Sequence, residues 1–262
     1  MKVLIVVKNI NKMTNPEIQF KIIQPDASLS DFVESFWMLA NHSDTGHEIV
    51  VLPDGRFDII FSYSSVEPYR IMQMGLGTEP DKNSIPPKAL MFAISFKLLA
   101  IEYLLDMKAA FLLNNAHRLP DDFWGVTKDD LNDFELFCKK VSAKMITLIK
   151  PNIDNRKQKL FELIYSSNGS LAVKELSEKV HWSSRQINRY FNEQFGIPLK
   201  TYYNILRFRA SLAHIKKGKL FPELNFTDQN HFIKEIKKFS GVVPKELSKN
   251  QNDRFILYQH CP

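Results

Sequence analysis

The 262-residue sequence lacks the features that define several common classes of protein. It has no apolar run near the ~20 residues that a membrane-spanning helix needs, so we expect no membrane partner. Its two cysteines, Cys138 and Cys261, form no spaced framework, which favours reduced thiols in a cytoplasmic protein over disulfides. It also contains no Gly-rich phosphate loop and no Cys/His group with zinc spacing. The sequence therefore indicates no catalytic residue, no metal ligand and no cofactor.

The N-terminal segment KVLIVVK places only five apolar residues between two lysines. This run is too short for the apolar core of a secretory signal. We interpret it as a short strand, or as a non-native extension that precedes a native start at Met13.

Charge is distributed unevenly along the chain. Residues 1–154 contain 16 Lys and Arg against 20 Asp and Glu, whereas residues 155–262 contain 19 against 9. The two parts therefore carry net charges of −4 and +10. This division favours a polyanion such as nucleic acid as the partner of the C-terminal part, and a basic but inert domain is the alternative.

The first half of the chain has the pattern of a β-rich domain. The runs EIVVLP, RFDIIFSY and YRIMQM predict strands, and LPDG (residues 52–55) predicts a turn. SLSDFVESFWML (28–39) has a partly helical pattern with Ser30 as its N-cap. ALMFAISFKLLAIEYLLD (89–106) predicts a buried strand followed by a helix, and residues 127–150 predict a further helix.

From Arg156 the pattern is helical almost to the end of the chain. PNIDN (151–155) is the predicted boundary between an N-terminal domain, 14–150, and a C-terminal domain, 156–250. Five helices are expected in the second domain: one closing at Gly169, one capped by Ser170, one from Ser183 to Gly196, one from Pro198 to Gly218, and one in DQNHFIKEIKKFSG.

Two of these helices belong to segments that echo each other, SSRQINRYFNEQFGIP and TDQNHFIKEIKKFSGVVP. On a helical wheel each has an apolar face opposite a basic face that also bears amides. The apolar faces hold Ile187, Tyr190 and Phe191, and Phe232, Ile236 and Phe239; the polar faces hold Arg185, Asn188, Arg189 and Asn192, and Asn230, Lys234, Lys237 and Lys238. In helix-turn-helix units the second helix lies in the major groove, where Arg suits guanine and Asn or Gln suits adenine. For a single helix a solvated charged face is the simpler interpretation, and the matched pair favours DNA.

Residues 160–248 resemble the AraC/XylS-type DNA-binding domain. The resemblance is carried by Ser183, Phe191, Gly196, Pro198, the run Arg207-Phe-Arg-Ala-Ser, the run Phe226-Thr-Asp-Gln-Asn-His-Phe, and Gly241-Val-Val-Pro244. It implies two helix-turn-helix units joined by a linker helix. It also implies these base-facing residues: Arg185, Asn188 and Arg189 in the first unit, and Gln229, Asn230, Ile233 and Lys234 in the second.

The sequence departs from the family pattern in three places. His181 stands where the family has Gly in the first turn, and Asn225 replaces the Gly before Phe226. The stretch between Arg207 and Phe226 is shorter than in the family, and KLFPELNF replaces a helix of the second unit. Because Pro222 would break a helix interior, we expect that helix to be one turn or less.

Residues 14–126 resemble the cupin-type β-barrels that often precede this DNA-binding module, on the segments LSDFVESFW and VLPDGRFDIIF. We therefore predict an α+β chain: an N-terminal β-rich, cupin-like barrel domain, and a C-terminal all-α domain with two helix-turn-helix units. The resemblance implies a cytoplasmic bacterial transcriptional regulator that binds double-stranded DNA as a homodimer. A small-molecule effector, sensed by the first domain, and RNA polymerase are the further partners implied.

Two other classes stay open: a scaffold or sensor whose basic domain binds protein, and a cupin-type enzyme fused to a DNA-binding module. His42, His47 and Glu48 do not have the cupin metal-binding spacing. Asp54 and Asp58 form a candidate carboxylate pair, although the turn already explains Asp54. For the remaining candidates we favour packing roles: Trp37 and Trp124 over ligand stacking, Cys138 as a buried thiol, and His231 in packing or on a phosphate.

Overall fold

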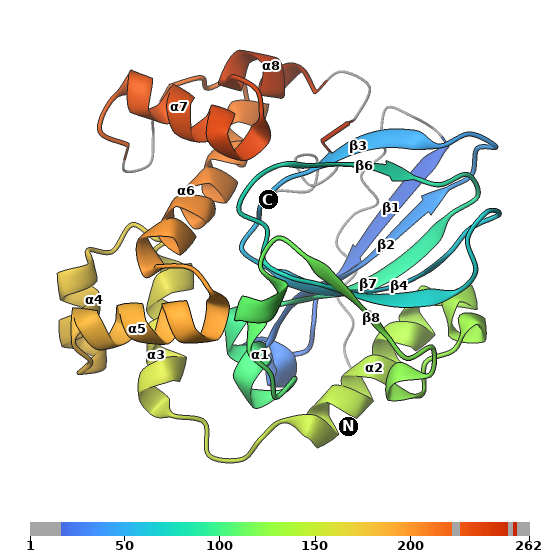
Figure 1. Cartoon of the computed structure of the whole chain (residues 1–262), viewed down its shortest axis with the longest axis horizontal. Coiled ribbons are helices and arrows are strands. Elements are labelled where there is room, and N and C mark those ends of the chain that lie inside the picture. The colour runs from blue at the N-terminus through green and yellow to red at the C-terminus, as the bar shows by residue number, and fades with distance from the viewer. Residues whose placement is uncertain (1–16, 222–225, 251–253, 256–262) are drawn as a thin grey trace.

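The computed structural model describes residues 17–221, 226–250 and 254–255, and a β-rich region precedes a helical region in it. The predicted α+β fold class is therefore confirmed (Figure 1). Several features of the sequence lie outside the described residues: the segment KVLIVVK, the alternative start at Met13, and the residues Pro222, Asn225 and Cys261.

The β-rich region contains two antiparallel sheets within the described residues. The strands are β1 (Ile18–Ile23), β2 (Val33–Asn41), β3 (His47–Val51), β4 (Phe57–Tyr63), β5 (Arg70–Met74), β6 (Asp81–Ile85), β7 (Leu90–Phe96) and β8 (Ala116–Leu119). The larger sheet has the order β1-β2-β7-β4-β5-β8, and β3 pairs with β6 separately. Figure 1 shows the β3–β6 pair on one side of the larger sheet and helix α2 on the other.

The helices follow the strands for the most part. The α-helices are α1 (Leu98–Tyr103), α2 (Phe134–Leu148), α3 (Asn155–Ser166), α4 (Val173–Val180), α5 (Ser184–Phe195), α6 (Leu199–Lys216), α7 (Gln229–Ser240) and α8 (Pro244–Lys249). Short 3-10 turns occur at η1 (Ala27–Leu29), η2 (Ala109–Leu112), η3 (Phe123–Gly125) and η4 (Lys128–Asn132).

The larger sheet buries a different set of side chains on each face. On one face Phe61 and Phe92 pack against Phe137 of α2, with ring centroids 5.2 and 5.3 Å apart. On the other face, toward β3 and β6, Phe20 stacks on Trp37 with centroids 6.1 Å apart. Successive side chains of β4 point to opposite faces of the sheet, so Asp58 lies on the face opposite its buried neighbours Phe57 and Ile59.

Strand β2 contains an irregularity that matters for the rest of the molecule. Its register against β7 shifts between Val33 and Ser35, so Glu34 lies in a β-bulge. A bulge leaves one residue unpaired and re-aims its side chain. Glu34 thereby meets Arg56 and Lys97, which adjoin β4 and β7, as well as Arg209 of α6.

Most local predictions for the β-rich region are confirmed. Residues 127–150, expected to form one helix, instead form η4 followed by α2. The three predicted strand runs are β3, β4 and β5, and residues 89–106 form β7 followed by α1. In the LPDG turn, Asp54 Oδ1 accepts a hydrogen bond from Arg56 N at 2.9 Å, and Gly55 has φ +74°. Residues 28–39, expected to be partly helical, instead form the end of η1 and most of β2. Pairing of β2 with both β1 and β7 overrides the local pattern there.

The helix signals of the second half are confirmed except for one cap. Asp154 in PNIDN caps α3 by accepting from Arg156 N at 2.9 Å, so this segment separates α2 from α3 as expected. Ser170 does not cap α4, which begins three residues later with Ala172 as its N-cap. The backbone N–H of Ser170 instead donates to Ser167 O in the turn that follows α3.

Candidate DNA-binding surface

Helices α4 and α5 form a helix-turn-helix unit with a complete set of local signals. Residue His181 turns the chain at φ +51°, the left-handed conformation that glycine would supply in the AraC/XylS-type pattern. Ser183 caps α5 in a capping box: its Oγ accepts from Gln186 N at 3.3 Å, and its own N–H donates to Gln186 Oε1 at 2.9 Å. Gly196 ends α5 at φ +75°.

Helix α5 has one fully buried face and one basic face open to solvent. Ile187, Phe191 and Phe195 are buried, as the wheel predicts for the first two. Arg185 and Arg189 are exposed, and the Arg189 side chain is 71% accessible with only a loose 4.0 Å approach to Glu193. These two guanidinium groups are therefore available for bases or phosphates.

Asn188 lies between the two faces. It is half-buried, and its Nδ2 donates to Ser184 O, 3.0 Å away in the preceding turn. To pair with adenine this amide would have to leave the backbone acceptor, so Asn188 is placed less favourably than Arg185 and Arg189.

Helix α7 repeats the arrangement. Asp228 caps it by accepting from His231 N at 2.8 Å, and Gly241 ends it at φ +77°. As predicted, Phe232, Ile236 and Phe239 are buried. The predicted reading residues differ in placement: Asn230 and Lys234 are exposed and Ile233 is half-buried, whereas the exposed Gln229 donates through Nε2 to Leu220 O at 2.8 Å. Gln229 thus holds the chain that leads into the helix.

The described residues that precede α7 differ from those that precede α5. Between α6 and α7, residues 217–221 and 226–228 contain no helix. Phe226 packs its ring edge-on against Phe232 at 5.1 Å, and Thr227 N donates to His231 Nδ1 at 3.3 Å. His231 therefore has a packing role at the start of α7, where its ring also lies 5.8 Å from that of Phe226.

Helix α6 joins the two units and is itself largely buried. Its 18 residues extend over about 27 Å at 1.5 Å per residue. Tyr202, Ile205, Phe208 and Leu212 are buried along it, and it contacts α5, α7 and α8. Because α6 is a single continuous helix that contacts both α5 and α7, it sets the spacing of these two helices (Figure 1).

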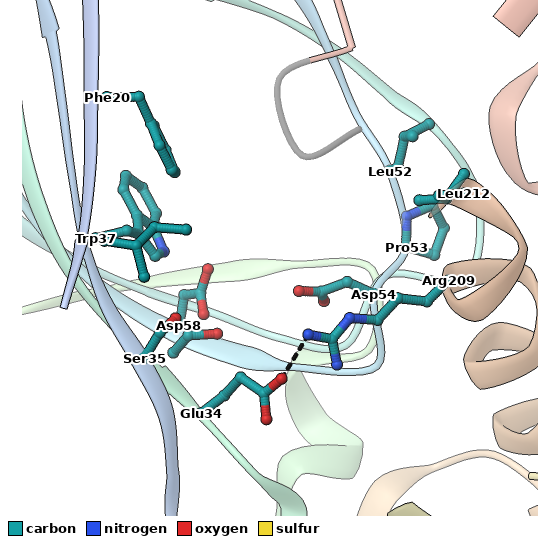
Figure 2. Close-up of a pocket in the computed structure, with 12 residues that line it drawn as sticks. Phe20, Glu34, Ser35, Trp37, Leu52, Pro53, Asp54, Asp58, Arg209 and Leu212 are labelled. Atoms are coloured by element: carbon teal, nitrogen blue, oxygen red, sulfur yellow. Dashed lines mark hydrogen bonds and ion pairs between the residues drawn. The ribbon is translucent and has the colours of Figure 1, made fainter. Parts of the chain in front are cut away.

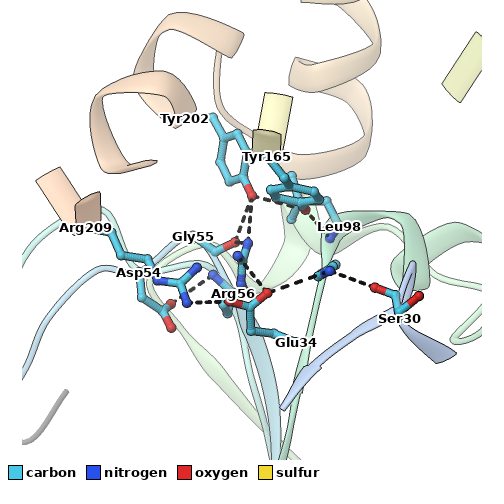
Figure 3. A network of polar contacts seen from close by, with 10 residues as sticks. Ser30, Glu34, Asp54, Gly55, Arg56, Leu98, Tyr165, Tyr202 and Arg209 are labelled. Carbon is cyan, nitrogen blue, oxygen red and sulfur yellow. Dashed lines mark hydrogen bonds and ion pairs between the residues drawn. The ribbon is translucent and has the colours of Figure 1, made fainter. Parts of the chain in front are cut away.

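A partly buried network of charges connects the helical region to the β-rich region (Figure 3). Glu34, from the bulge in β2, forms an ion pair with Arg56 at 3.0 Å and another with Arg209 of α6. Lys97 approaches the same carboxylate at 3.9 Å. Burial opposes ionisation of Glu34, but the charges of Arg56 and Arg209 outweigh it and lower its pKa to about 2.

Arg56 is the centre of this network. Its guanidinium lies 4.8 Å from the ring centroid of Tyr165, and its Nη1 donates to Tyr202 Oη at 3.4 Å. Tyr202 donates in turn to Gly55 O at 3.0 Å. In the sequence, the only indication that Arg56 has a structural role is its position directly after the LPDG turn. Nothing in the sequence connects Arg56 with Glu34 or Arg209.

Further contacts attach α5 itself to the β-rich region. The Tyr190 hydroxyl donates to Glu102 Oε2 at 3.0 Å, and Gln194 Nε2 donates to Met107 O at 2.6 Å. The basic face of α5 thus points to solvent while its opposite side is anchored.

Candidates for other chemistry can also be located in the described part of the chain. Among the described residues, no group of three or more His, Cys, Asp or Glu side chains is placed to hold a metal ion. His42 Nε2 lies 3.2 Å from Gln19 Oε1, and Cys138 is buried, which raises the pKa of its thiol. Within the same residues, no helix combines the length and apolarity that crossing a membrane requires.

The fold and these surfaces define a class: a β-rich region joined to a helical region that presents a helix-turn-helix unit and a second capped basic helix. The residues that carry the AraC/XylS-type resemblance form caps, helix ends and core positions of these helices, among them Ser183, Phe191, Gly196 and Gly241.

Comparisons with known proteins add the following similarities. A family model described as a domain of unknown function (DUF6597) matches residues 21–118. Comparison with curated proteins gives no match. Among solved structures, ToxT from Vibrio cholerae is 12% identical with a TM-score of 0.42, covering 82% of this chain and 97% of that chain. ToxT from Vibrio cholerae O395 bound to (E)-4-(8-methylnaphthalen-1-yl)but-3-enoic acid is 13% identical with a TM-score of 0.44, covering 81% and 97%.

Proposed function

We propose that the chain is a sequence-specific DNA-binding transcriptional regulator of the AraC type. The observation that carries this proposal is α5, a capped helix in a helix-turn-helix unit with Arg185 and Arg189 exposed opposite a fully buried face. The net charge of +10 on residues 155–262 supports it, because phosphate contacts supply much of the affinity for DNA.

The proposal assigns a part to each segment. Residues 156–250 bind double-stranded DNA, with α5 and α7 in major-groove segments about one turn, ~34 Å, apart. Residues 14–150 sense a small-molecule effector or form a homodimer, and the regulator acts with RNA polymerase in the bacterial cytoplasm. Of the seven base-facing candidates, the geometry favours Arg185, Arg189, Asn230 and Lys234. It assigns Gln229 mainly to the loop before α7.

A selection experiment tests the proposal. The purified protein is incubated with a randomised duplex pool at physiological salt, and the bound fraction is sequenced. Two enriched blocks about one helical turn apart would support reading by both α5 and α7. A single block would assign sequence reading to α5 and phosphate contact to the second unit.

A matched pair of variants makes the experiment sharper. Arg185→Ala/Arg189→Ala is expected to abolish the enrichment. Arg118→Ala, which removes an exposed arginine paired with Asp121 on the β-rich region, is expected to leave it unchanged. Absence of enrichment for the unaltered protein, with weak salt dependence, would reject sequence-specific binding and favour a scaffold that contacts proteins.

A further inference from the structure

A cavity lies between the larger sheet and helix α6 (Figure 2). Its volume is about 70 Å³, several times the ~10–15 Å³ that one water molecule needs. Strands β1, β2, β4 and β7 form one wall, and the segment Leu52–Asp54 with Arg209 and Leu212 of α6 forms the other. A small organic molecule in this space would contact both regions of the protein.

Acidic side chains predominate in the lining of the cavity, which holds Glu34, Asp54 and Asp58 and one basic residue, Arg209. Glu34 pairs with Arg56, Arg209 and Lys97, whereas Asp54 and Asp58 form no ion pair with a basic side chain of the described residues. Figure 2 shows the Asp54 and Asp58 side chains facing each other across the cavity. Ser95 and Trp37 donate hydrogen bonds to Asp58, yet its buried Oδ1 has no partner in the described structure. An unpartnered buried carboxylate oxygen is costly unless a donor completes it.

The electrostatics of Asp58 agree with this geometry. Burial is the largest cause, and the negative charge of Asp54 the second, that raise the pKa of Asp58 to about 7. Hydrogen bonds from Ser95 and Trp37 and the charge of Arg56 act in the opposite direction and lower this pKa. A cation placed between the two carboxylates would offset the cost of burying the charged Asp58 and the repulsion from Asp54.

The other walls of the cavity are apolar or aromatic. Phe20 and Trp37, stacked at an interplanar angle of 18°, form one side, and Leu52, Pro53 and Leu212 form the other. Aromatic faces attract ammonium groups, and apolar walls accept a short hydrocarbon chain. The described residues offer no cluster of metal ligands here, which argues for an organic cation over a metal ion.

We propose that this cavity binds a small organic cation, a short alkylammonium compound, with its ammonium group between Asp54 and Asp58 and its carbon chain against Trp37. The cation completes the hydrogen bonding of Asp58 and touches α6 through Arg209 and Leu212. Since α6 fixes the spacing of α5 and α7, occupancy is coupled to DNA binding. This coupling rests on the proposed function, whereas binding of the cation does not.

The first test measures binding alone, by isothermal titration calorimetry at pH 8 with n-butylammonium, n-butanol and butyrate as probes of equal chain length. We expect the ammonium compound to bind and the alcohol and carboxylate to fail. Asp58→Asn is expected to weaken binding by about tenfold or more, the loss of one charge-assisted hydrogen bond. Asp44→Asn, which alters an exposed aspartate paired with Lys88, should bind as the unaltered protein does.

A pH series keeps the test independent of any folding defect in the variant. The charged groups that face Asp58 or line the cavity are Asp54, Arg56, Glu34 and Arg209. Because the cation requires ionised Asp58, its affinity should fall between pH 8 and pH 6, toward tenfold per pH unit below the pKa. Equal binding of alcohol and ammonium, no binding of the amine at millimolar concentration, or an affinity that Asp58→Asn leaves unchanged would each overturn the proposal.

The second test adds n-butylammonium to the DNA-selection assay. A shift in affinity for the enriched duplex that Asp58→Asn abolishes is the result expected for coupling. Calorimetric binding with an unchanged affinity for DNA would overturn the coupling and leave the cation site in place. Calorimetric binding without any enriched duplex would instead overturn the proposed function.

Discussion

Replacement of Glu34 by glutamine is expected to destabilise the folded protein by about 3 kcal/mol at pH 7. The side chain of Arg56 is only 4% exposed, and Glu34 is its ion-pair partner at 3.0 Å. Removing one partner of a buried pair typically costs about 3–5 kcal/mol, because the other charge stays buried without compensation. Hydrogen bonding to Tyr202 and stacking on Tyr165 remain for Arg56, so the lower end of this range applies.

The pKa of Glu34 gives a second route to the same magnitude. Its folded value of about 2 lies below the ordinary 4.5, and at about 1.4 kcal/mol per pH unit the difference corresponds to about 3 kcal/mol. Since the folded pKa is depressed, this stability is present above the unfolded pKa and is lost as the pH falls from 4.5 toward 2. Glutamine does not titrate, so the difference between the two proteins should shrink over the same interval.

Urea unfolding followed by tryptophan fluorescence at pH 7, 5 and 3 measures the free energy of unfolding of both proteins. The control is Glu67→Gln, since Glu67 pairs with Arg70 at 2.8 Å on a partly exposed surface, where such pairs contribute about 0–1 kcal/mol. If Glu34→Gln cost no more than Glu67→Gln at pH 7, the idea that Arg56 depends on a buried counter-charge would be refuted.

Three further predictions concern single residues. Arg189→Ala should cost ~1–3 kcal/mol at the preferred duplex and relax one base position, measured by titration against single-base variants of that duplex; equal loss on every duplex would make Arg189 a phosphate contact. His181→Gly should raise the free energy of unfolding by about 1 kcal/mol in thermal melts, because glycine adopts φ +51° without the steric cost that histidine has. An unchanged or lowered midpoint would contradict this account of the turn. Cys138, which is 2% exposed with a raised thiol pKa, should react with a thiol reagent only after unfolding, and rapid reaction in the native protein would show that its helix opens readily.

The first helix-turn-helix unit could be predicted closely because its signals are local. Ser183 and Gly196 stand at the two ends of α5, and the spacing of Ile187 and Phe191 identifies the buried face. Caps and helical periodicity depend on residues within about four positions of each other, so sequence order alone reveals them.

Segments whose structure depends on distant partners were predicted less well. Residues 28–39 have a helical pattern, yet β2 forms because β1 and β7 flank it on both sides. The Glu34–Arg209 ion pair joins residues 175 positions apart, and no local signal could have revealed it. The cavity could not be predicted: the sequence offers Asp54 and Asp58 as a candidate carboxylate pair, but the turn already explains Asp54, and the wall supplied by α6 requires the folded chain.

The order of strands in the larger sheet has a consequence for how the protein opens. Glu34, Trp37, Asp58 and Ser95 belong to β2, β4 and β7, each of which has hydrogen-bonded neighbours on both sides. Amide hydrogens in such strands exchange with solvent only in rare, large openings, whereas those in short peripheral helices such as α8 exchange through local fraying. Amide hydrogens of β2, β4 and β7 should therefore exchange more slowly than those of the C-terminal helices. The cavity wall supplied by the sheet should persist after the helices at the C-terminal end have begun to unfold.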